Sequence, residues 1–346
     1  AILRLREAAP EGLRFVAVDT SGQVLSLARA RAAQDPGLPD LHTVLLSEGT
    51  EGLGTGGDAG LAAAAARAAA ASVLEAAGQA EVVLLAGGLG GGTGAGATPQ
   101  LARLLRDAGC VVIGFGIMPF GFESAPRQTR AEEALGYLRA ACDSCLALDN
   151  DRLLASAAAE ESLDVALRVA DDLIRQAASG LVALAACEAW LRLDLPTAEE
   201  LLAEGGDACL ALGLGRGPQP AGRAMRAALA SPLTDMKALC QARSVLVQVT
   251  GDGALALHDV ADAVAILEAL LPDGCQVMAG VAEDPTLRGA AQVMLLGLGL
   301  PGPVRLRQPH PRSASQAGRL QLLPRRLHLD LERGAYSFDP PQRRVG

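Results

Sequence analysis

Two stretches of the chain place glycines where backbone amides could bind an anion. The first is GLGGGTGAGATP at residues 88–99, and the second is EGLGTGGDAG at residues 51–60. Each follows a strand-like apolar run and opens a segment of helical length. A glycine loop at a helix N-terminus lets N–H groups approach phosphate without a Cβ in the way, and the helix dipole favours the negative charge. A tight exposed turn is the alternative for either loop alone, but two such loops favour a nucleotide.

The composition of the 346-residue chain excludes several classes of partner and enzyme. The net charge is −9 and aromatic residues make up 2%, whereas a nucleic-acid binder usually presents a basic face with stacking rings. We therefore predict no nucleic-acid partner. Lys237 is the single lysine. It does not stand in a G-x-x-x-x-G-K-[ST] loop, so the Walker type of phosphate site is excluded, and a Schiff-base lysine elsewhere is excluded as well.

The seven cysteines are scattered through apolar stretches and are odd in number, which is typical of thiols in a reducing compartment. Cys142 and Cys145 form a C-x-x-C pair, but without a second pair we favour core thiols over zinc and predict no metal site in the protein. No apolar run reaches about 18 residues without glycine or charge, so no membrane span is predicted. We expect a cytoplasmic protein.

The elements around the longer loop form a predicted βαβ unit. Strands are expected at 80–88 and 110–118, and the segment 98–109 between them has leucines at helical spacing. Pro99 is expected in the first turn of this helix, and Gly109 ends it. Parallel strands joined in this way place the loop at the carboxyl edge of a sheet, where ligands bind. Further strands are expected at 13–20 and 42–48.

The rest of the chain predicts a second domain and a tail. An alanine- and leucine-rich stretch at 156–185 indicates one long connecting helix. Residues 186–300 mix strand and helix patterns and predict a second α/β domain. Residues 301–346 are rich in arginine, with nine Arg against three acidic residues after Pro301, which predicts a basic, flexible tail. The first domain is then 1–155.

A dinucleotide-binding oxidoreductase is a distant alternative. The string GLGTGG at 52–57 satisfies the G-x-G-x-x-G spacing, so an NAD-dependent dehydrogenase has to be considered. However, the four histidines form no recognisable proton-donor constellation, and GGGTGAG does not follow the dinucleotide spacing.

Several motifs, in order along the chain, resemble the tubulin and FtsZ superfamily of GTPases. GLGGGTGAG at 88–96 is similar to its phosphate loop, and GLGTGGD to its second glycine loop. FVAVDTSGQVL at 15–25, PFGFESAPRQ at 119–128 and LDNDRLL at 148–154 resemble further FtsZ motifs. GDACLALGLGRG and ASPL extend the resemblance into the second domain. It implies the tubulin/FtsZ fold: a Rossmann-like GTPase domain with a parallel sheet, a long central helix and a second α/β activation domain.

The resemblance also implies GTP or GDP as ligand, Mg²⁺ with GTP, and head-to-tail homopolymers. Glu123 and Arg127 are implied in ribose and phosphate contacts, although an exposed i,i+4 ion pair is the structural alternative. Asn150 is implied to bind the guanine, near the positions of Ala166 and Asp171. The residues implied to cradle the phosphates are Gly54, Thr55, Gly56, Gly57, Gly90, Gly91, Gly92, Thr93, Gly94, Ala95 and Gly96.

The chain departs from the FtsZ pattern at three places. The first strand and first phosphate loop of FtsZ would lie upstream of Ala1, and we expect them to be missing from this sequence. The family's aromatic residue that stacks on guanine aligns with Ala166, so the sequence does not decide whether the protein prefers guanine or adenine. The synergy loop N-x-D-x-x-D aligns with RLDLPT at 192–197, where Asp194 remains and Thr197 replaces the second acid.

The altered synergy loop predicts slow GTP hydrolysis. In the family this loop acts on the neighbouring subunit's nucleotide, so Asp194 would be donated across the filament interface, and a missing carboxylate costs on the order of a hundredfold in rate. Asp194 could instead cap the following helix. The leading hypothesis is thus a slowly hydrolysing, polymerising GTPase for cell division or membrane remodelling. The alternative is a non-hydrolysing filament or regulatory paralogue. The basic tail could bind a membrane adaptor, anionic lipid or the acidic body.

Overall fold

The structure is a computed structural model, and it describes residues 13–34, 40–152, 176, 206–231 and 234–301, with two short strands beyond them. Residues 1–307 form one compact unit and residues 308–346 a second. In the second unit, β10 (His328–Asp330) pairs antiparallel with β11 (Ala335–Ser337). The helix predicted at 156–185 and most of the tail lie outside the described residues. Gln176, inside the predicted range, is helical.

The first strands of the chain form a small sheet of their own. β1 (Phe15–Asp19) pairs in parallel with β2 (Leu41–Leu45), and α2 (Gly22–Ala32) connects them. Ser21 is the N-cap of α2, and its hydroxyl accepts a hydrogen bond from Val24 N. Within the described residues this two-stranded sheet makes no ladder with β3. Both strands match the predicted positions.

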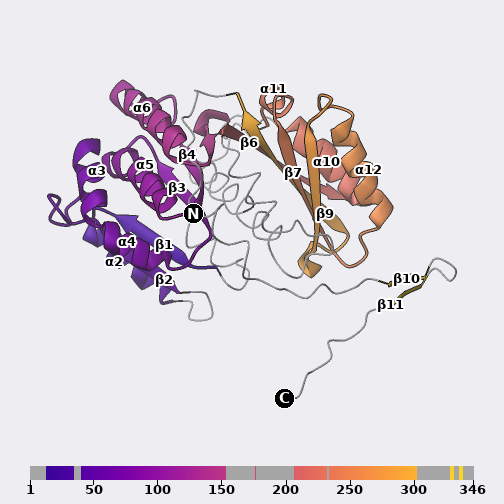
Figure 1. Cartoon of the computed structure of the whole chain (residues 1–346), viewed down its shortest axis with the longest axis horizontal. Coiled ribbons are helices and arrows are strands. Elements are labelled where there is room, and N and C mark those ends of the chain that lie inside the picture. The colour runs from indigo at the N-terminus through magenta and orange to yellow at the C-terminus, as the bar shows by residue number, and fades with distance from the viewer. Residues whose placement is uncertain are drawn as a thin grey trace, which may run out of the picture. The chain divides into compact units, whose positions relative to one another are not determined.

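A seven-stranded sheet runs through both predicted domains in the order β3-β4-β5-β6-β9-β7-β8 (Figure 1). β3 to β6 are parallel, β7 and β8 are parallel, and β9 is antiparallel to both of its neighbours. The β5–β6 ladder is short, from Ser144↔Gly206 to Leu146↔Ala208. The strands are β3 (Val82–Gly88), β4 (Val111–Ile117), β5 (Ser144–Leu148), β6 (Gly206–Arg216), β7 (Ser244–Gly251), β8 (Gln276–Glu283) and β9 (Ala290–Leu300).

Helices cover this sheet in two groups. In the first group α5 lies between α3 and α6, and in the second α10 and α12 pack together over β6 and β9 (Figure 1). A short helix, α11, precedes β7, and a 3-10 turn, η1, precedes β9. These elements are α3 (Ala59–Ala68), α4 (Ala70–Ala77), α5 (Gly92–Asp107), α6 (Ala125–Ala141), α10 (Pro220–Ala230), α11 (Met236–Leu239), α12 (Leu257–Glu268) and η1 (Pro285–Leu287).

The buried apolar residues form three clusters, and one of them crosses the boundary between the two predicted domains. Phe115 on β4 and Leu146 on β5 share a cluster with Leu246 on β7 and Met294 on β9. The helices α5 and α6 cover a second cluster, and α10 and α12 cover the third. Apolar side chains in one continuous cluster couple the two parts of the sheet energetically, because each loses its burial if the parts separate.

The helix after the longer glycine loop begins earlier than the sequence predicts. The structure starts α5 at Gly92 and leaves Pro99 in its interior rather than in its first turn. Glycine is a poor helix former, so local propensity predicts that the helix begins later in the chain. Close packing decides otherwise, because a Cβ on Gly96 would overlap the backbone oxygen of Ala59. Gly109, with a φ of +91°, ends the helix as predicted.

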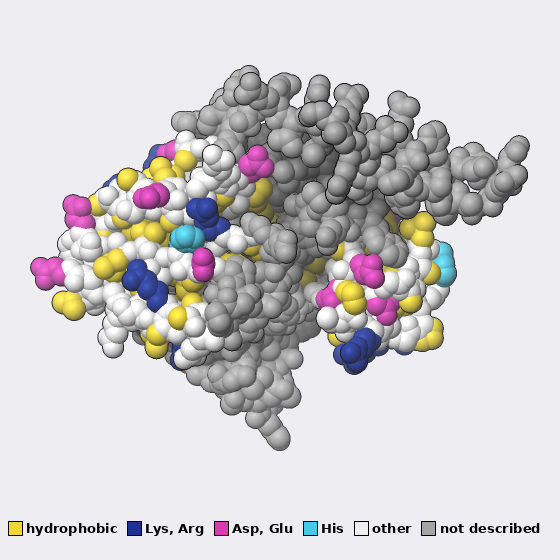
Figure 2. Space-filling model, turned by 90° about the horizontal axis from the view of Figure 1, so that it is seen from below, with side chains coloured by type: hydrophobic (Ala, Val, Ile, Leu, Met, Phe, Trp, Pro, Cys, Tyr) yellow, Lys and Arg dark blue, Asp and Glu magenta, His cyan; other side chains and the backbone are white. Residues whose placement is uncertain are grey.

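The molecular surface in Figure 2 shows isolated acidic and basic side chains among apolar and backbone surface. On the described part of this face, the two signs of charge are interspersed. In the part of the chain that the structure describes, no single helix has the length and apolarity needed to cross a membrane. The pair α3 and α4 passes that test only together, across a bend of 68°.

Candidate nucleotide-binding site

The two glycine-rich stretches lie against one another, although one follows β2 of the small sheet and the other follows β3 of the large sheet. We call residues 88–96 the phosphate loop and residues 51–58 the second loop. The phosphate loop continues β3 into α5, and the second loop opens α3, whose N-cap Asp58 accepts a hydrogen bond from Leu61 N. Two backbone hydrogen bonds hold the second loop at the end of β1: Gly22 N to Gly52 O (2.9 Å) and Gly54 N to Thr20 O (3.1 Å).

The glycines of the phosphate loop divide into two kinds. A Cβ on Gly92 would collide with Thr55 Oγ1 and the backbone of Gly57 in the second loop, and one on Gly94 would collide with Gly88 O. These glycines are required by packing. A Cβ on Gly88 or Gly91 would meet no described residue within 4 Å. The open space at these two positions is where a ligand can approach the main chain.

The N-terminus of α5 presents its amides beside this open space. Gly91 is the N-cap, and no side chain caps the helix. The first N–H groups of a helix have no partner within it, so an uncapped N-terminus next to glycines is suited to an anion. The amide of Ala95 donates to Gly91 O (3.1 Å) and is therefore used inside the helix. The amides of Gly92, Thr93 and Gly94 remain the candidates for phosphate.

Thr20 joins the end of β1 to the phosphate loop. Its Oγ1 lies 2.6 Å from Thr93 Oγ1, and its side chain is fully buried. Thr50, directly before the second loop, supports the same region, because its hydroxyl donates to Leu46 O (2.7 Å). The sequence analysis did not single out Thr20 or Thr50. The signal for Thr20 was available, because it is the polar residue that directly follows the apolar strand FVAVD at the ligand-binding edge.

A second group of loops lies beside the phosphate loop and comes from the segments 119–124 and 149–152. A Cβ on Gly90 would meet Pro119 at 3.1 Å. Asp151 accepts the amide of Gly121 on both carboxylate oxygens, at 2.9 and 3.1 Å. Phe120 and Phe122 stack with ring centroids 5.1 Å apart, and Phe122 remains largely exposed. Asp151 thus joins the motifs PFGFE and LDND into one wall of the candidate site.

Glu123 and Arg127 form the i,i+4 ion pair that the sequence analysis considered as the structural alternative. Glu123 also accepts the amide of Phe120 at 2.9 Å. The hydrogen bond from Arg127 lowers the pKa of Glu123, against an opposing effect of partial desolvation. The pair is exposed on its outer side, with Arg127 55% exposed. Its role in ribose and phosphate contacts stays a prediction.

Asn150 is buried, at 6% exposure, and its Oδ1 has no hydrogen-bond partner among the residues that the structure describes. A buried polar atom without a partner costs free energy, so such atoms are expected to find a donor when a ligand binds. The remaining predicted site residues, Ala166, Asp171, Asp194 and Thr197, lie outside the described residues.

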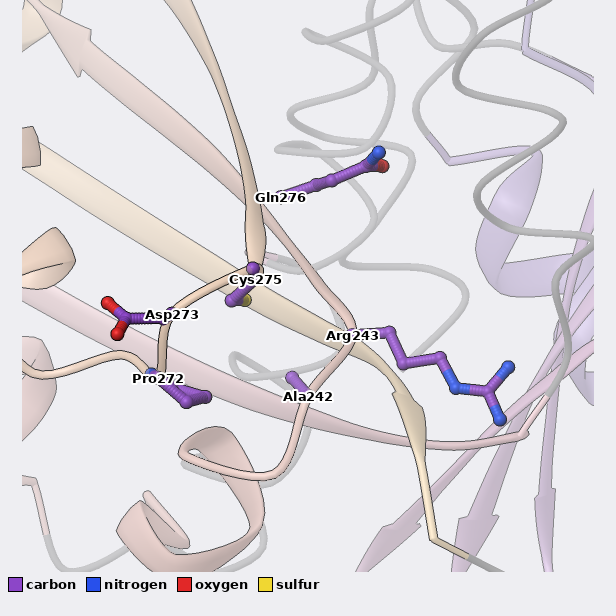
Figure 3. A pocket seen from close by; sticks show the side chains of 7 residues that line it. Ala242, Arg243, Pro272, Asp273, Cys275 and Gln276 are labelled. Carbon is purple, nitrogen blue, oxygen red and sulfur yellow. The ribbon is translucent and has the colours of Figure 1, made fainter.

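An open hollow of about 420 Å³ lies elsewhere, where the chain enters β7 and β8. Figure 3 shows that its charged side chains, Arg243 and Asp273, extend in opposite directions. A binding site needs polar groups that converge on one ligand, and this hollow does not present them. The loops at the carboxyl ends of β1 and β3 remain the better candidate.

The fold is that of an α/β protein in which two glycine-rich loops meet at the N-terminus of α5. The model of the Tubulin/FtsZ family, GTPase domain, matches residues 8–158, and that of the FtsZ family, C-terminal domain, matches residues 206–300. The chain therefore belongs to the Tubulin/FtsZ family of GTPases, as the sequence motifs predicted.

Solved structures support the same assignment. An empty FtsZ dimer from M. jannaschii is similar with a TM-score of 0.78 and 28% identity, covering 86% of this chain and 84% of that one. CetZ2 from Haloferax volcanii, solved as a GTPγS-bound protofilament, has a TM-score of 0.64 and 28% identity, with coverage of 83% and 84%. CetZ1 from the same organism, a GDP-bound monomer, has 21% identity and a TM-score of 0.65, covering 83% and 85%, and supports the fold.

Proposed function

We propose that this protein binds GTP at the phosphate loop and second loop, assembles head-to-tail into filaments, and hydrolyses GTP slowly. The observation that carries the proposal is the packing of the two loops around the uncapped N-terminus of α5, with open space at Gly88 and Gly91. The similar FtsZ dimer and CetZ2 protofilament support self-association as the mode of assembly.

The first test is calorimetric titration of the full protein with GTP, GDP and ATP. Saturable binding of GTP and GDP is expected, and ATP binding tests the preference for guanine. The orphaned Oδ1 of Asn150 supports the base side of the site, so Asn150→Ala is expected to weaken GTP binding by about tenfold. No binding of any nucleotide by the full protein would remove the proposal.

Slow hydrolysis is proposed from the sequence at 192–197. Asp194 keeps one carboxylate of the synergy loop, and Thr197 stands where the family has the second. A carboxylate that orients the attacking water contributes about a hundredfold or more. Thr197→Asp is therefore expected to raise the rate of phosphate release from assembled protein. Thr197→Asn is the matched control, because asparagine has the size of aspartate but no charge. Equal rates in the two variants would show that the missing charge is not what limits hydrolysis.

Assembly without turnover is the second candidate. Bound nucleotide can stabilise an assembly-competent state by differential affinity alone. Light scattering and pelleting with GTP, run beside phosphate release, separate the two: filaments with release at the buffer rate indicate a non-hydrolysing filament protein. We propose that the protein acts in cell division or membrane remodelling. Binding of the protein to anionic vesicles through its basic tail tests this role.

Mg²⁺ is proposed as the ion of the GTP-bound state. Among the described residues, no group of three or more His, Cys, Asp or Glu side chains could hold a metal. Mg²⁺ often binds through substrate phosphates with few protein ligands, so the site fits an ion that arrives with the nucleotide. Chelation with EDTA is expected to weaken GTP binding more than GDP binding.

A further inference from the structure

Arg130 lies on α6, hydrogen-bonds to the phosphate loop and lies close to the second loop. Its Nη1 donates a hydrogen bond to Gly90 O in the phosphate loop at 2.9 Å. Its Nη2 lies 3.6 Å from the place that a Cβ on Gly57 in the second loop would occupy. The guanidinium is half-buried at this junction. One side chain therefore lies next to both loops that the proposed function assigns to phosphate.

The hydrogen-bonding capacity of Arg130 is largely unused. A guanidinium has five N–H donors, and in the part of the chain that the structure describes Arg130 has one partner, a neutral carbonyl. No carboxylate of that part lies within ion-pair distance of it. Arg127, one helical turn earlier, is paired with Glu123. A half-buried guanidinium without an anionic partner fits an anionic ligand, because planar N–H pairs match phosphate oxygens.

The position of Arg130 adds to the charge of the loops. Gly90, its partner, directly precedes Gly91, the N-cap of α5. The guanidinium therefore lies beside the unpaired amides of Gly92 to Gly94 and the positive end of the helix dipole. The second loop reaches the same junction through Gly57, whose φ of +94° favours glycine. A phosphate held by the α5 amides would have Arg130 beside it, at the side where the second loop closes.

We propose that Arg130 binds the terminal phosphate of a nucleoside triphosphate and couples the second loop to it. The inference rests on the proposed function and assigns it a further residue, one that distinguishes triphosphate from diphosphate. When the terminal phosphate is present, Arg130 bridges Gly90, Gly57 and the phosphate. When it is absent, the guanidinium keeps its single bond to Gly90 O.

The test compares GTP and GDP affinities of Arg130→Gln with those of the unchanged protein. Arg130→Gln is expected to weaken GTP binding by about tenfold, equivalent to about 1.4 kcal/mol, and GDP binding by twofold or less. Arg130→Lys keeps the charge and is expected to recover part of the GTP affinity. Arg103→Gln is the matched control, because Arg103 is exposed on α5 and makes no interaction in the described structure. It is expected to change neither affinity.

The GTP-to-GDP affinity ratio separates a role at the phosphate from a structural one. A variant that only loosens the loops would weaken the binding of GTP and GDP equally, and that result would overturn the inference. Unchanged GTP affinity in Arg130→Gln, or an Arg130→Lys variant no better than Arg130→Gln, would overturn it as well. If the unchanged protein bound no nucleotide, the proposed function itself would fail, so the two failures are distinguishable. Thermal unfolding without nucleotide verifies that each variant is folded.

Discussion

The hydroxyls of Thr20 and Thr93 lie 2.6 Å apart and join the end of β1 to the phosphate loop. β1 belongs to a two-stranded sheet that has no ladder with β3 in the described structure. This side-chain contact, together with the backbone bonds of the second loop, therefore links the small sheet to the first turn of α5. Three separate stretches of sequence meet in this one contact region.

Removing one of these hydroxyls is expected to destabilise the protein. Thr20→Val keeps the side-chain shape but leaves Thr93 without its partner in a buried place, which costs about 1–3 kcal/mol. The free energy of unfolding from urea denaturation measures this loss, and Thr20→Ser is the control that keeps a hydroxyl. The double variant Thr20→Val with Thr93→Val should cost less than the sum of the singles. Additive losses would contradict a direct bond.

The two kinds of glycine predict opposite effects of alanine. Gly96→Ala would push a methyl group into Ala59 O and is expected to cost about 3 kcal/mol or more of stability. Gly91→Ala places its methyl in open space at φ −94°, ψ 171°, which alanine tolerates, so stability should change by less than about 0.5 kcal/mol.

For nucleotide binding, Gly91→Ala is expected to be the more damaging of these two substitutions. Gly91→Ala is expected to lower GTP affinity by about tenfold or more, because its methyl occupies the space in front of the amides. Thermal unfolding and calorimetric titration of the two variants give both quantities. A Gly91→Ala variant with unchanged GTP affinity would show that the ligand does not approach the loop from this side.

Asp259 on α12 anchors the N-terminus of α10. Its buried carboxylate accepts the amides of Ala221 (2.8 Å) and Gly222 (3.1 Å). Asp259→Ala leaves both amides without this partner and is expected to cost about 2–4 kcal/mol of unfolding free energy. Asp262→Ala on the exposed face of α12 is the control, with an expected change below about 0.5 kcal/mol. Equal losses would mean that the carboxylate of Asp259 does not stabilise α10.

The ion pair between Glu123 and Arg127 predicts a measurable titration. Because Arg127 lowers the pKa of Glu123, the pair stabilises the fold above the ordinary carboxyl pKa of 4.5, and this stabilisation is lost as the pH falls through the lowered pKa. Arg127→Gln should raise that pKa toward 4.5, as followed by carbon NMR of the carboxylate. The stability difference should stay below about 1 kcal/mol, since the pair is exposed. An unmoved Glu123 resonance would assign the shift to another group.

The sequence predicted the alternation of strands and helices well because its strands are mostly parallel and continuously apolar. Runs such as VVLLAGG and VVIGFGI are continuously apolar, and glycine-rich loops separate them from amphipathic helices. The start of α5 was misplaced because the three glycines and the proline in its first half make a weak helix by local propensity. Gly92 packs against the second loop and Gly96 against Ala59 on α3, each more than 30 residues earlier in the chain, and these contacts fix the helix there.

The chain's own residues determined the class of protein, because phosphate loops need glycine at fixed positions and such positions are visible in a sequence. The motifs could name Gly91 and Asn150, but they could not show that Gly91 faces open space or that Asn150 Oδ1 is buried without a partner. Nor could spacing distinguish Arg127, whose charge Glu123 neutralises, from Arg130, whose guanidinium donates to Gly90 O in the phosphate loop. Tertiary structure decided these roles, because burial, open space and the partner of a charge depend on residues that are distant along the chain.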